Sequence, residues 1–286
     1  MSKVIVVTDS TAYIPAELIN GHRIQSVPLQ VIWGDKVYRD GIDIQPEEFY
    51  RNLPKSEVLP TTSQATPADF INLYRSILDE GNEVLSMHIS SKLSGTMDSA
   101  MQARNALRSD KIELVDSLST VMSLGFQAVA TAELAAKGAS LKECKRYAES
   151  LVPHMGVYFV VNTLEYLHRG GRIGGAAAFL GTVLNLKPIL ELRDGRIEAI
   201  DKVRTQTKAL DRLIDLVIER LSTEKGPYSL ATLHADDLAT ANALLEKITS
   251  RLPADQVRHA VISSVSPVLG THTGPGAVGI AFLANP

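Results

Sequence analysis

The sequence predicts an α/β protein of two domains, with a parallel sheet in the first and a mixed sheet in the second. The 286 residues are enough for two domains at about 150 residues each. Short apolar runs alternate with amphipathic helical stretches as far as Pro153, which is typical of a parallel sheet covered by helices. Beyond that point, Asp194-Gly195 between two alternating runs predicts an antiparallel hairpin. We therefore expect domains at residues 1–154 and 155–286.

The elements of the first domain are predicted from the spacing of its apolar residues, which differs between strands and helices. Residues 4–7 form a continuous β-branched run, as in strands that are buried on both faces. Residues 68–80 place Phe70, Tyr74 and Ile77 on one helical face and stop at Gly81. By the same reasoning, further strands are expected at residues 84–89 and 112–115, and further helices at 96–107, 118–137 and 141–151.

The second domain is predicted to be α+β. The hairpin joins strands at residues 188–192 and 197–203, and helices are expected at residues 205–221 and 236–252. Apolar runs predict the other strands at residues 157–161, 228–233, 257–262 and 278–283. A hairpin combined with helices favours a mixed sheet.

Composition narrows the function classes. Hydrophobic residues make up 45% and charged residues 21% of the chain, which is ordinary for a soluble globular protein. The formal net charge of −3 gives no electrostatic reason to expect nucleic acid or an anionic membrane as a partner. Cys144 is the single cysteine, which fits a reducing compartment. We therefore expect a cytoplasmic protein without stable membrane insertion.

Two polar segments near the N-terminus have different explanations. Thr8-Asp9-Ser10-Thr11 follows the first strand, and a turn that caps the next helix accounts for it as well as a ligand does. Thr61-Thr62-Ser63-Gln64 precedes Thr66-Pro67, a helix start that needs only Thr66 as its cap. The donors upstream of Thr66 are therefore surplus to the cap and indicate a ligand.

Two further segments have the chemistry of an anion site. Ser90 to Thr96 lies between a strand and a helix, where ligands of open α/β sheets bind and where helix N-terminal amides favour anions. Ser94 either caps that helix or directs its hydroxyl at an anionic ligand. His272 stands in what we expect to be a flexible glycine loop, from which its ring can donate a hydrogen bond to an anion.

Several other chemistries are disfavoured. Gly274 to Gly279 matches G-x-G-x-x-G, but only a strand fits after it, so we expect no dinucleotide site. The sequence has no G-x-x-x-x-G-K-[ST] loop and no G-x-S-x-G elbow. The histidines are too scattered for metal-ligand spacing. We therefore predict no metal and no cofactor.

Taken together, these segments resemble the DegV family, the fatty-acid-binding proteins of bacterial fatty-acid kinase systems. The resemblance covers essentially the whole chain. The motifs that carry it are Thr8-Asp9-Ser10-Thr11, Thr61-Thr62-Ser63-Gln64, Ser91-Lys92-Leu93-Ser94-Gly95-Thr96, Leu164-Glu165-Tyr166-Leu167-His168-Arg169-Gly170-Gly171-Arg172-Ile173 and His272-Thr273-Gly274-Pro275-Gly276. Each motif is weak alone, but five in the expected order are highly specific.

The resemblance implies a fold and a function. The fold is a Rossmann-like N-terminal domain and an α+β C-terminal domain, with a long-chain fatty acid in an apolar tunnel between them. An ATP-dependent fatty-acid kinase then phosphorylates the bound acid to an acyl phosphate, so the chain itself is a carrier and not an enzyme. By resemblance, Thr62, Ser94 and His272 bind the carboxylate, and the supporting loop residues are Ser63, Gly95 and Thr273. Arg169, Arg172 and Arg204 are expected to dock the kinase from exposed positions.

The alternative function belongs to a different class. Ser94 as nucleophile and His272 as base would make the chain a stand-alone acyl transferase or esterase. Turnover of a chromogenic ester that is lost in Ser94→Ala would favour the enzyme, whereas a fatty acid that co-purifies with the protein would favour the carrier.

Overall fold

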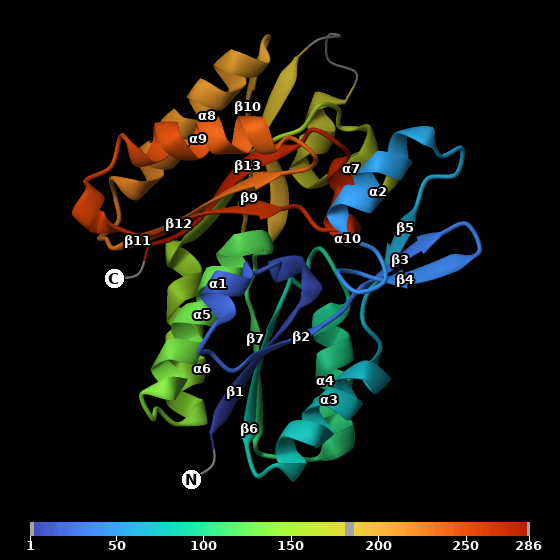
Figure 1. Cartoon of the computed structure of the whole chain (residues 1–286), viewed down its shortest axis with the longest axis vertical. Coiled ribbons are helices and arrows are strands. Elements are labelled where there is room, and N and C mark those ends of the chain that lie inside the picture. Colours follow the sequence, from blue (N-terminus) through green and yellow to red (C-terminus); the bar gives the residue numbers. More distant parts are fainter. Residues whose placement is uncertain (1–2, 181–185, 285–286) are drawn as a thin grey trace.

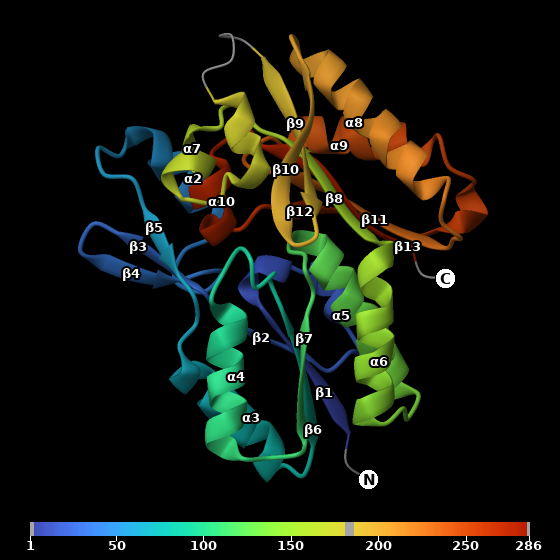
Figure 2. The same cartoon turned by 180° about the vertical axis from the view of Figure 1, so that it is seen from behind.

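The computed structural model describes residues 3–180 and 186–284. Two sheets lie one above the other along the long axis, with the N-terminal sheet below and the C-terminal sheet above (Figures 1 and 2). The lower sheet is entirely parallel, in the order β2-β1-β6-β7. Its strands are β1 (Val4–Asp9), β2 (Ile24–Val27), β6 (Glu83–His88) and β7 (Ile112–Asp116).

Helices cover both faces of the parallel sheet, as the alternating sequence pattern predicts. On one face lie α3 (Pro67–Asp79) and α4 (Thr96–Leu107), and on the other α5 (Val121–Ala136) and α6 (Leu141–Leu151) (Figure 1). Separate apolar clusters fill the two faces. The short elements of this half are η1 (Ser10–Ala12), α1 (Ala16–Ile19) and η3 (Val152–His154).

A small antiparallel sheet that the sequence patterns did not predict projects from the N-terminal half. Its order is β4-β3-β5, with β3 (Gln30–Trp33), β4 (Lys36–Arg39) and β5 (Thr61–Ser63). The elements α2 (Pro46–Asn52) and η2 (Leu53–Lys55) lie between β4 and β5. All four residues of β4 are at least partly exposed, so the strand has no buried face and shows no apolar alternation.

The upper sheet has six strands in the order β10-β9-β8-β13-β11-β12. They are β8 (Met155–Val160), β9 (Lys187–Arg193), β10 (Arg196–Val203), β11 (Tyr228–His234), β12 (Val257–Ser264) and β13 (Val278–Ala284). Only β11 and β12 pair in parallel, so the sheet is mixed, as predicted. The hairpin at Asp194-Gly195 is confirmed, with Arg193 opposite Arg196.

The two faces of the upper sheet have different neighbours. One face packs against α8 (Gln206–Leu221) and α9 (Leu238–Thr249) in an apolar cluster of its own. The other face shares a cluster with α2 and the start of α5, so a continuous core joins the two halves. The remaining elements are α7 (Glu165–Arg169), η4 (Gly174–Phe179), η5 (Ala254–Gln256) and α10 (Pro267–Thr273).

Two expectations about local structure are wrong. The helix expected over residues 118–137 begins only at Val121. Leu118 and Val121 both have left-handed φ angles, at 48° and 50°, and regular α-helical backbone cannot run through such residues. His272 lies in α10 and not in a flexible loop, since Ser266 caps that helix and Pro267 occupies its first turn. The domain division at residues 154 and 155 stays a prediction.

No helix in the described part of the chain is both long enough and apolar enough to span a bilayer.

Candidate ligand-binding site

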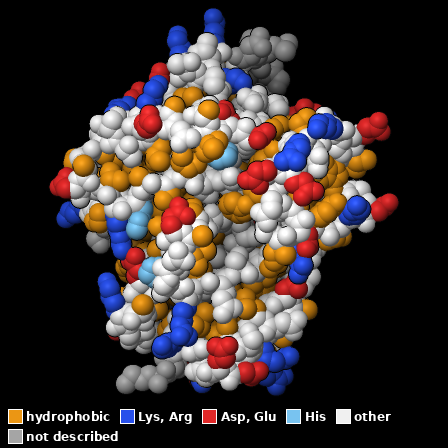
Figure 3. All heavy atoms as spheres, viewed as in Figure 1, with side chains coloured by type: hydrophobic (Ala, Val, Ile, Leu, Met, Phe, Trp, Pro, Cys, Tyr) orange, Lys and Arg blue, Asp and Glu red, His pale blue; other side chains and the backbone are white. Residues whose placement is uncertain are grey.

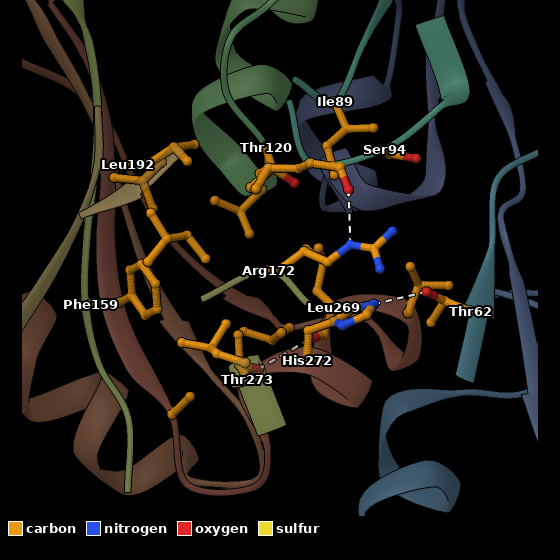
Figure 4. Close-up of a pocket in the computed structure, with 18 of the residues that line it drawn as sticks. Thr62, Ile89, Ser94, Thr120, Phe159, Arg172, Leu192, Leu269, His272 and Thr273 are labelled. Atoms are coloured by element: carbon orange, nitrogen blue, oxygen red, sulfur yellow. Dashed lines mark hydrogen bonds between the residues drawn. The ribbon is translucent and has the colours of Figure 1, made fainter. Parts of the chain in front are cut away.

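A cavity lies where the two halves meet (Figure 4). It comprises about 960 Å³ of space outside the protein atoms, part of it open to solvent. Apolar side chains from both halves dominate its wall, among them Ile89, Leu93, Val157, Phe159, Leu192 and Ile197. Thr62, Ser94 and His272 all line this cavity, so the structure brings together the predicted head-group residues from three distant parts of the sequence.

Thr62 and His272 meet at one end of the cavity. Thr62 lies on β5 and His272 in the last turn of α10, and α10 packs against β5. The Thr62 hydroxyl and His272 Nε2 are hydrogen-bonded at 2.8 Å (Figure 4). Which of the two atoms donates depends on the imidazole tautomer.

The imidazole of His272 is neutral at physiological pH. Burial, with a smaller contribution from the nearby Arg172 charge, lowers its pKa to about 4. Its Nδ1 is buried and has no hydrogen-bond partner among the described residues. A neutral ring carries one N–H donor and one acceptor, so His272 and Thr62 together can supply at least one donor to an anion.

Ser94 reaches the cavity from the segment that links β6 to α4. Its Oγ pairs with the Thr96 hydroxyl at 2.9 Å and accepts a weaker bond from the Thr96 amide at 3.3 Å. The start of this segment is fixed by the buried Asp9, whose carboxylate accepts from the Ile89 amide at 2.9 Å. Asp9 also caps η1 by accepting from the Thr11 amide, which confirms the cap interpretation of that motif.

The three predicted supporting residues surround these side chains. Ser63 and Thr273 line the cavity, and their hydroxyls donate to backbone carbonyls, Ser63 to Gln64 and Thr273 to Leu269. Gly95 precedes α4 as its N-cap. A Cβ at Gly95 would come within 3.0 Å of the Gln64 side chain, so the glycine allows close approach of the two loops.

Arg172 is not exposed as predicted. It is half-buried and lines the cavity. Its Nε donates to the Leu93 carbonyl at 3.1 Å and its Nη1 to the Gly170 carbonyl at 2.6 Å. The guanidinium therefore links the Ser94 segment to the glycine-rich turn. Both carbonyls gain a donor, which buried backbone carbonyls need.

The other two predicted docking arginines are at the surface. The Arg169 side chain is 57% exposed and forms an ion pair with Glu165 at 2.5 Å. Arg204 is exposed, and its side chain has no ion pair or hydrogen bond within the described ranges. On the face in Figure 3, acidic and basic side chains are interspersed. A positively charged docking surface on this face would therefore involve only a few neighbouring side chains.

A second, more polar cavity adjoins the first. Tyr166, Arg169 and Thr61 line it, and it shares Thr62, Arg172 and His272 with the first cavity. These three shared side chains therefore stand between an apolar compartment and a polar one.

Thr120 and Val121 also line the first cavity, and sequence reasoning missed both. The run Ser117-Leu118-Ser119-Thr120 follows strand β7 at its carboxyl end, which is the signal that identified the Ser94 segment. Residues 118–120 of this run fall instead within the helix that the sequence predicts over residues 118–137. Among the residues that the structure describes, no group of three or more His, Cys, Asp or Glu side chains is placed to hold a metal ion.

Comparison with known proteins identifies the family. The family model described as "Uncharacterised protein, DegV family" matches residues 3–285. The chain belongs to the DegV family. A DegV domain-containing protein of Streptomyces coelicolor is 39% identical to this DegV chain over 278 residues, and the alignment covers 97% of each. Protein DegV of Bacillus subtilis is 36% identical, with 98% of each chain covered.

Solved DegV structures share the whole fold. The chain is 37% identical to a DegV family protein from Thermus thermophilus whose structure is described for its fatty-acid binding, with a TM-score of 0.91 and 99% of each chain covered. A structure of DegV from Bacillus subtilis, described as a fatty-acid-binding protein, gives 35% identity and a TM-score of 0.88 over 99% of this chain and 100% of the other. The predicted two-part α/β DegV fold is thus confirmed.

Proposed function

We propose that this DegV protein binds one long-chain fatty acid in the first cavity and presents its carboxylate to an ATP-dependent fatty-acid kinase. The observation that carries the proposal is the cavity itself, whose mainly apolar wall also contains the polar side chains of Thr62, Ser94 and His272. The fatty-acid binding described for the relatives from Thermus thermophilus and Bacillus subtilis supports it.

The apolar wall supplies most of the binding free energy. Burial of an acyl chain gains about 0.8 kcal/mol per CH₂ group, or on the order of 10 kcal/mol for a long chain before costs. Ordering the chain and losing translational freedom offset part of this gain. A short acid would therefore bind poorly even with every polar contact at the head group intact.

The polar end satisfies the carboxylate without clamping it. A buried carboxylate without partners is costly, and hydroxyl and imidazole donors are each worth about 1.5–3 kcal/mol to a charged group. Arg172 adds a nearby positive charge, but its Nε and Nη1 already donate to backbone carbonyls. The carboxylate is thus held by single donors and keeps a lone pair free for reaction.

The polar cavity beyond Thr62, Arg172 and His272 supports presentation to a partner. A carboxylate at this boundary has its acyl chain in the apolar compartment and its oxygens toward the polar one. In the proposed reaction a carboxylate oxygen attacks the γ-phosphorus of ATP on the kinase. An acyl phosphate forms and ADP leaves.

The acyl transferase or esterase alternative is less well supported by the geometry. His272 Nε2 pairs with Thr62, and the Ser94 hydroxyl pairs with Thr96. Nucleophilic catalysis needs the serine hydroxyl within hydrogen-bond reach of the base, with a third group to orient that base. Here His272 Nδ1 has no orienting partner in the described ranges.

Native mass spectrometry of the purified protein tests the binding proposal. We expect a long-chain fatty acid to co-purify with the wild-type protein. Ser94→Ala and His272→Ala should each weaken fatty-acid binding about tenfold or more, because each removes a hydrogen bond to a charged group. Ser91→Ala and His168→Ala are matched controls, since both side chains are exposed and line neither cavity. A carboxylate site elsewhere would leave all four variants with wild-type affinity.

A kinase assay tests presentation. Loaded protein is incubated with a bacterial fatty-acid kinase and ATP, and the acyl phosphate is trapped with hydroxylamine as a hydroxamate. We expect Arg204→Ala to slow product formation without changing fatty-acid affinity, and the deficit to narrow as salt rises, because salt screens exposed charges. Arg75→Ala, an exposed arginine on α3, should behave as wild type. No hydroxamate from the loaded wild-type protein would refute presentation and leave binding untouched.

A further inference from the structure

One hydroxyl in the wall of the first cavity has no hydrogen-bond partner among the described residues. Thr120 lines the cavity and is only 8% exposed, and its Oγ1 makes no hydrogen bond within the described ranges. A buried hydroxyl without a partner is costly, and such groups need an explanation. Thr8 and Thr232 also bury unpaired hydroxyls, but neither lines the cavity. Thr120 is therefore placed where a ligand atom can satisfy it.

The Thr120 hydroxyl is also unused by the helix that it precedes. Thr120 is the N-cap residue of α5, which runs for 16 residues, yet its side chain makes no capping bond. A threonine at this position usually accepts from an amide of the first turn. The helix thus begins at the cavity wall without a side-chain cap, and the positive end of its dipole favours an oxygen atom nearby.

The loop that carries Thr120 has an unusual backbone conformation. Val121 has a φ of 50°, which is a marked outlier for a β-branched residue. Ser117 fixes the loop, because its hydroxyl donates to the His88 carbonyl at 2.6 Å and accepts from the Ser119 amide at 3.0 Å. Backbone strain of this kind concentrates at ligand sites, where it positions a side chain that relaxation would move.

Thr120 lies apart from Thr62 and His272, the hydrogen-bonded pair of the head-group site. Figure 4 shows Thr120 on the same side of the cavity as Ser94, with Thr62 and His272 on the other side and Leu192 and Phe159 at the left of the view. An acid with its carboxylate between Thr62 and His272 therefore brings its hydrocarbon chain, and not its head group, past Thr120. A hydroxyl group on that chain could either donate a hydrogen bond to the Thr120 hydroxyl or accept one from it.

We propose that Thr120, at the start of α5, forms a second polar subsite that binds a hydroxyl group on the acyl chain, so that the cavity selects a hydroxylated long-chain fatty acid. The inference rests on the proposed function, because it requires an acyl chain in the first cavity with its carboxylate at Thr62, Ser94 and His272.

Calorimetric titration of the delipidated full chain tests the subsite, with stearate, 10-hydroxystearate and 12-hydroxystearate as probes. Wild type should bind at least one hydroxystearate more tightly than stearate. Thr120→Val keeps the side-chain shape but loses the hydroxyl. This variant should bind that hydroxystearate about fivefold more weakly than wild type, because one hydrogen bond is lost. It should bind stearate more tightly than wild type. Thr120→Ser keeps a hydroxyl and should therefore keep the preference for the hydroxystearate over stearate.

Thr232→Val is the matched control, because it makes the same change at another buried, unpaired threonine that does not line the cavity. It should leave the affinity ratio of the two acids unchanged. If Thr120→Val does not fold, as judged by thermal unfolding, Thr120→Ala replaces it with the same expected loss. Stearate binding with an affinity ratio that is identical in wild type and Thr120→Val would overturn the subsite alone. Failure of every acid to bind wild type would overturn the proposed function with it.

Discussion

His272 shows at the scale of one residue how burial sets the chemistry of the proposed head-group site. The ring sits between Thr62 and the charge of Arg172, and its pKa falls to about 4. An uncharged ring is available as a directional donor or acceptor, whereas a charged one would pair tightly with a carboxylate. A bound carboxylate stabilises the protonated ring, so ligand binding raises the pKa of His272 again.

The lowered pKa predicts a pH dependence of stability. The unfolded chain protonates His272 near its ordinary pKa of about 6.5, while the folded chain resists protonation until about pH 4. Folded protein therefore binds fewer protons in this window, and the free energy of unfolding should fall as pH drops from about 6.5 to about 4, by on the order of 3 kcal/mol.

Urea unfolding of the ligand-free protein between these pH values, compared with His272→Gln, isolates this effect. The glutamine variant keeps a hydrogen-bonding side chain but cannot titrate, and other titrating groups are common to both proteins. The difference in unfolding free energy between the two proteins should be constant above about pH 6.5. Below that pH, the wild type should lose stability relative to the variant. Parallel curves throughout would show that His272 keeps its ordinary pKa.

At the scale of elements, the hairpin β9–β10 is fastened to the N-terminal half by its turn. The Gly195 carbonyl accepts from the Ser90 hydroxyl at 2.9 Å, and the Asp194 carbonyl accepts from Lys92 Nζ at 2.8 Å. These contacts bring the hairpin onto the segment that carries Ser94. They also hold Leu192 and Ile197, at the two sides of the turn, in the cavity wall.

Gly195→Ala should loosen this junction. Gly195 has a φ of 78°, and an added Cβ would collide with the Ser90 hydroxyl. Gly34→Ala is the control, because Gly34 also has a positive φ, at 61°, in a hairpin turn but nothing within 4 Å of its Cβ position. Both variants lose about 1 kcal/mol or more from backbone strain. Only Gly195→Ala should lose a further 1–3 kcal/mol, roughly, from the displaced hydrogen bonds.

Urea unfolding measures this difference, and the dissociation rate of bound stearate measures its effect on the cavity. Faster release from Gly195→Ala than from Gly34→Ala is expected, since the hairpin forms part of the wall. Equal unfolding free energies and equal release rates for the two variants would show that the turn contacts do not support the site.

At the scale of the whole molecule, the cavity belongs to neither half alone. Its wall takes Ile89 and Leu93 from the N-terminal half and Phe159 and Leu192 from the C-terminal half. The shared apolar cluster continues from this wall into the core around α2 and α5. An acyl chain in the cavity therefore adds apolar contacts to both halves at once and stabilises their association.

Palmitate should raise the melting temperature of the delipidated protein, while acetate at equal concentration should not. A ligand that binds only the folded state stabilises it by mass action, and free palmitate at about 100 times its dissociation constant should add about 5–10 °C for a chain of this length. Acetate has the carboxylate but no chain to bury. Equal shifts for the two acids would contradict an apolar tunnel, and differential scanning fluorimetry distinguishes the cases.

The sequence by itself determined the features that depend on neighbours along the chain. The β-branched run of β1, the apolar face of α3 and the Asp194-Gly195 turn express local dihedral preferences and one-sided burial, and the structure confirms them. The polar segment with Ser94 was also recognisable, because carboxyl ends of parallel strands share one edge.

Only the tertiary structure decided which of these groups meet. Thr62 and His272 are 210 residues apart, and their contact depends on how α10 packs against β5. The inward turn of Arg172 depends on the carbonyl of Leu93, which is 79 residues away in the sequence. Thr120 falls within the helix expected over residues 118–137, but the helix of the structure begins only at Val121, so Thr120 precedes it. Such contacts depend on the packing of complete elements, and no local pattern records that packing.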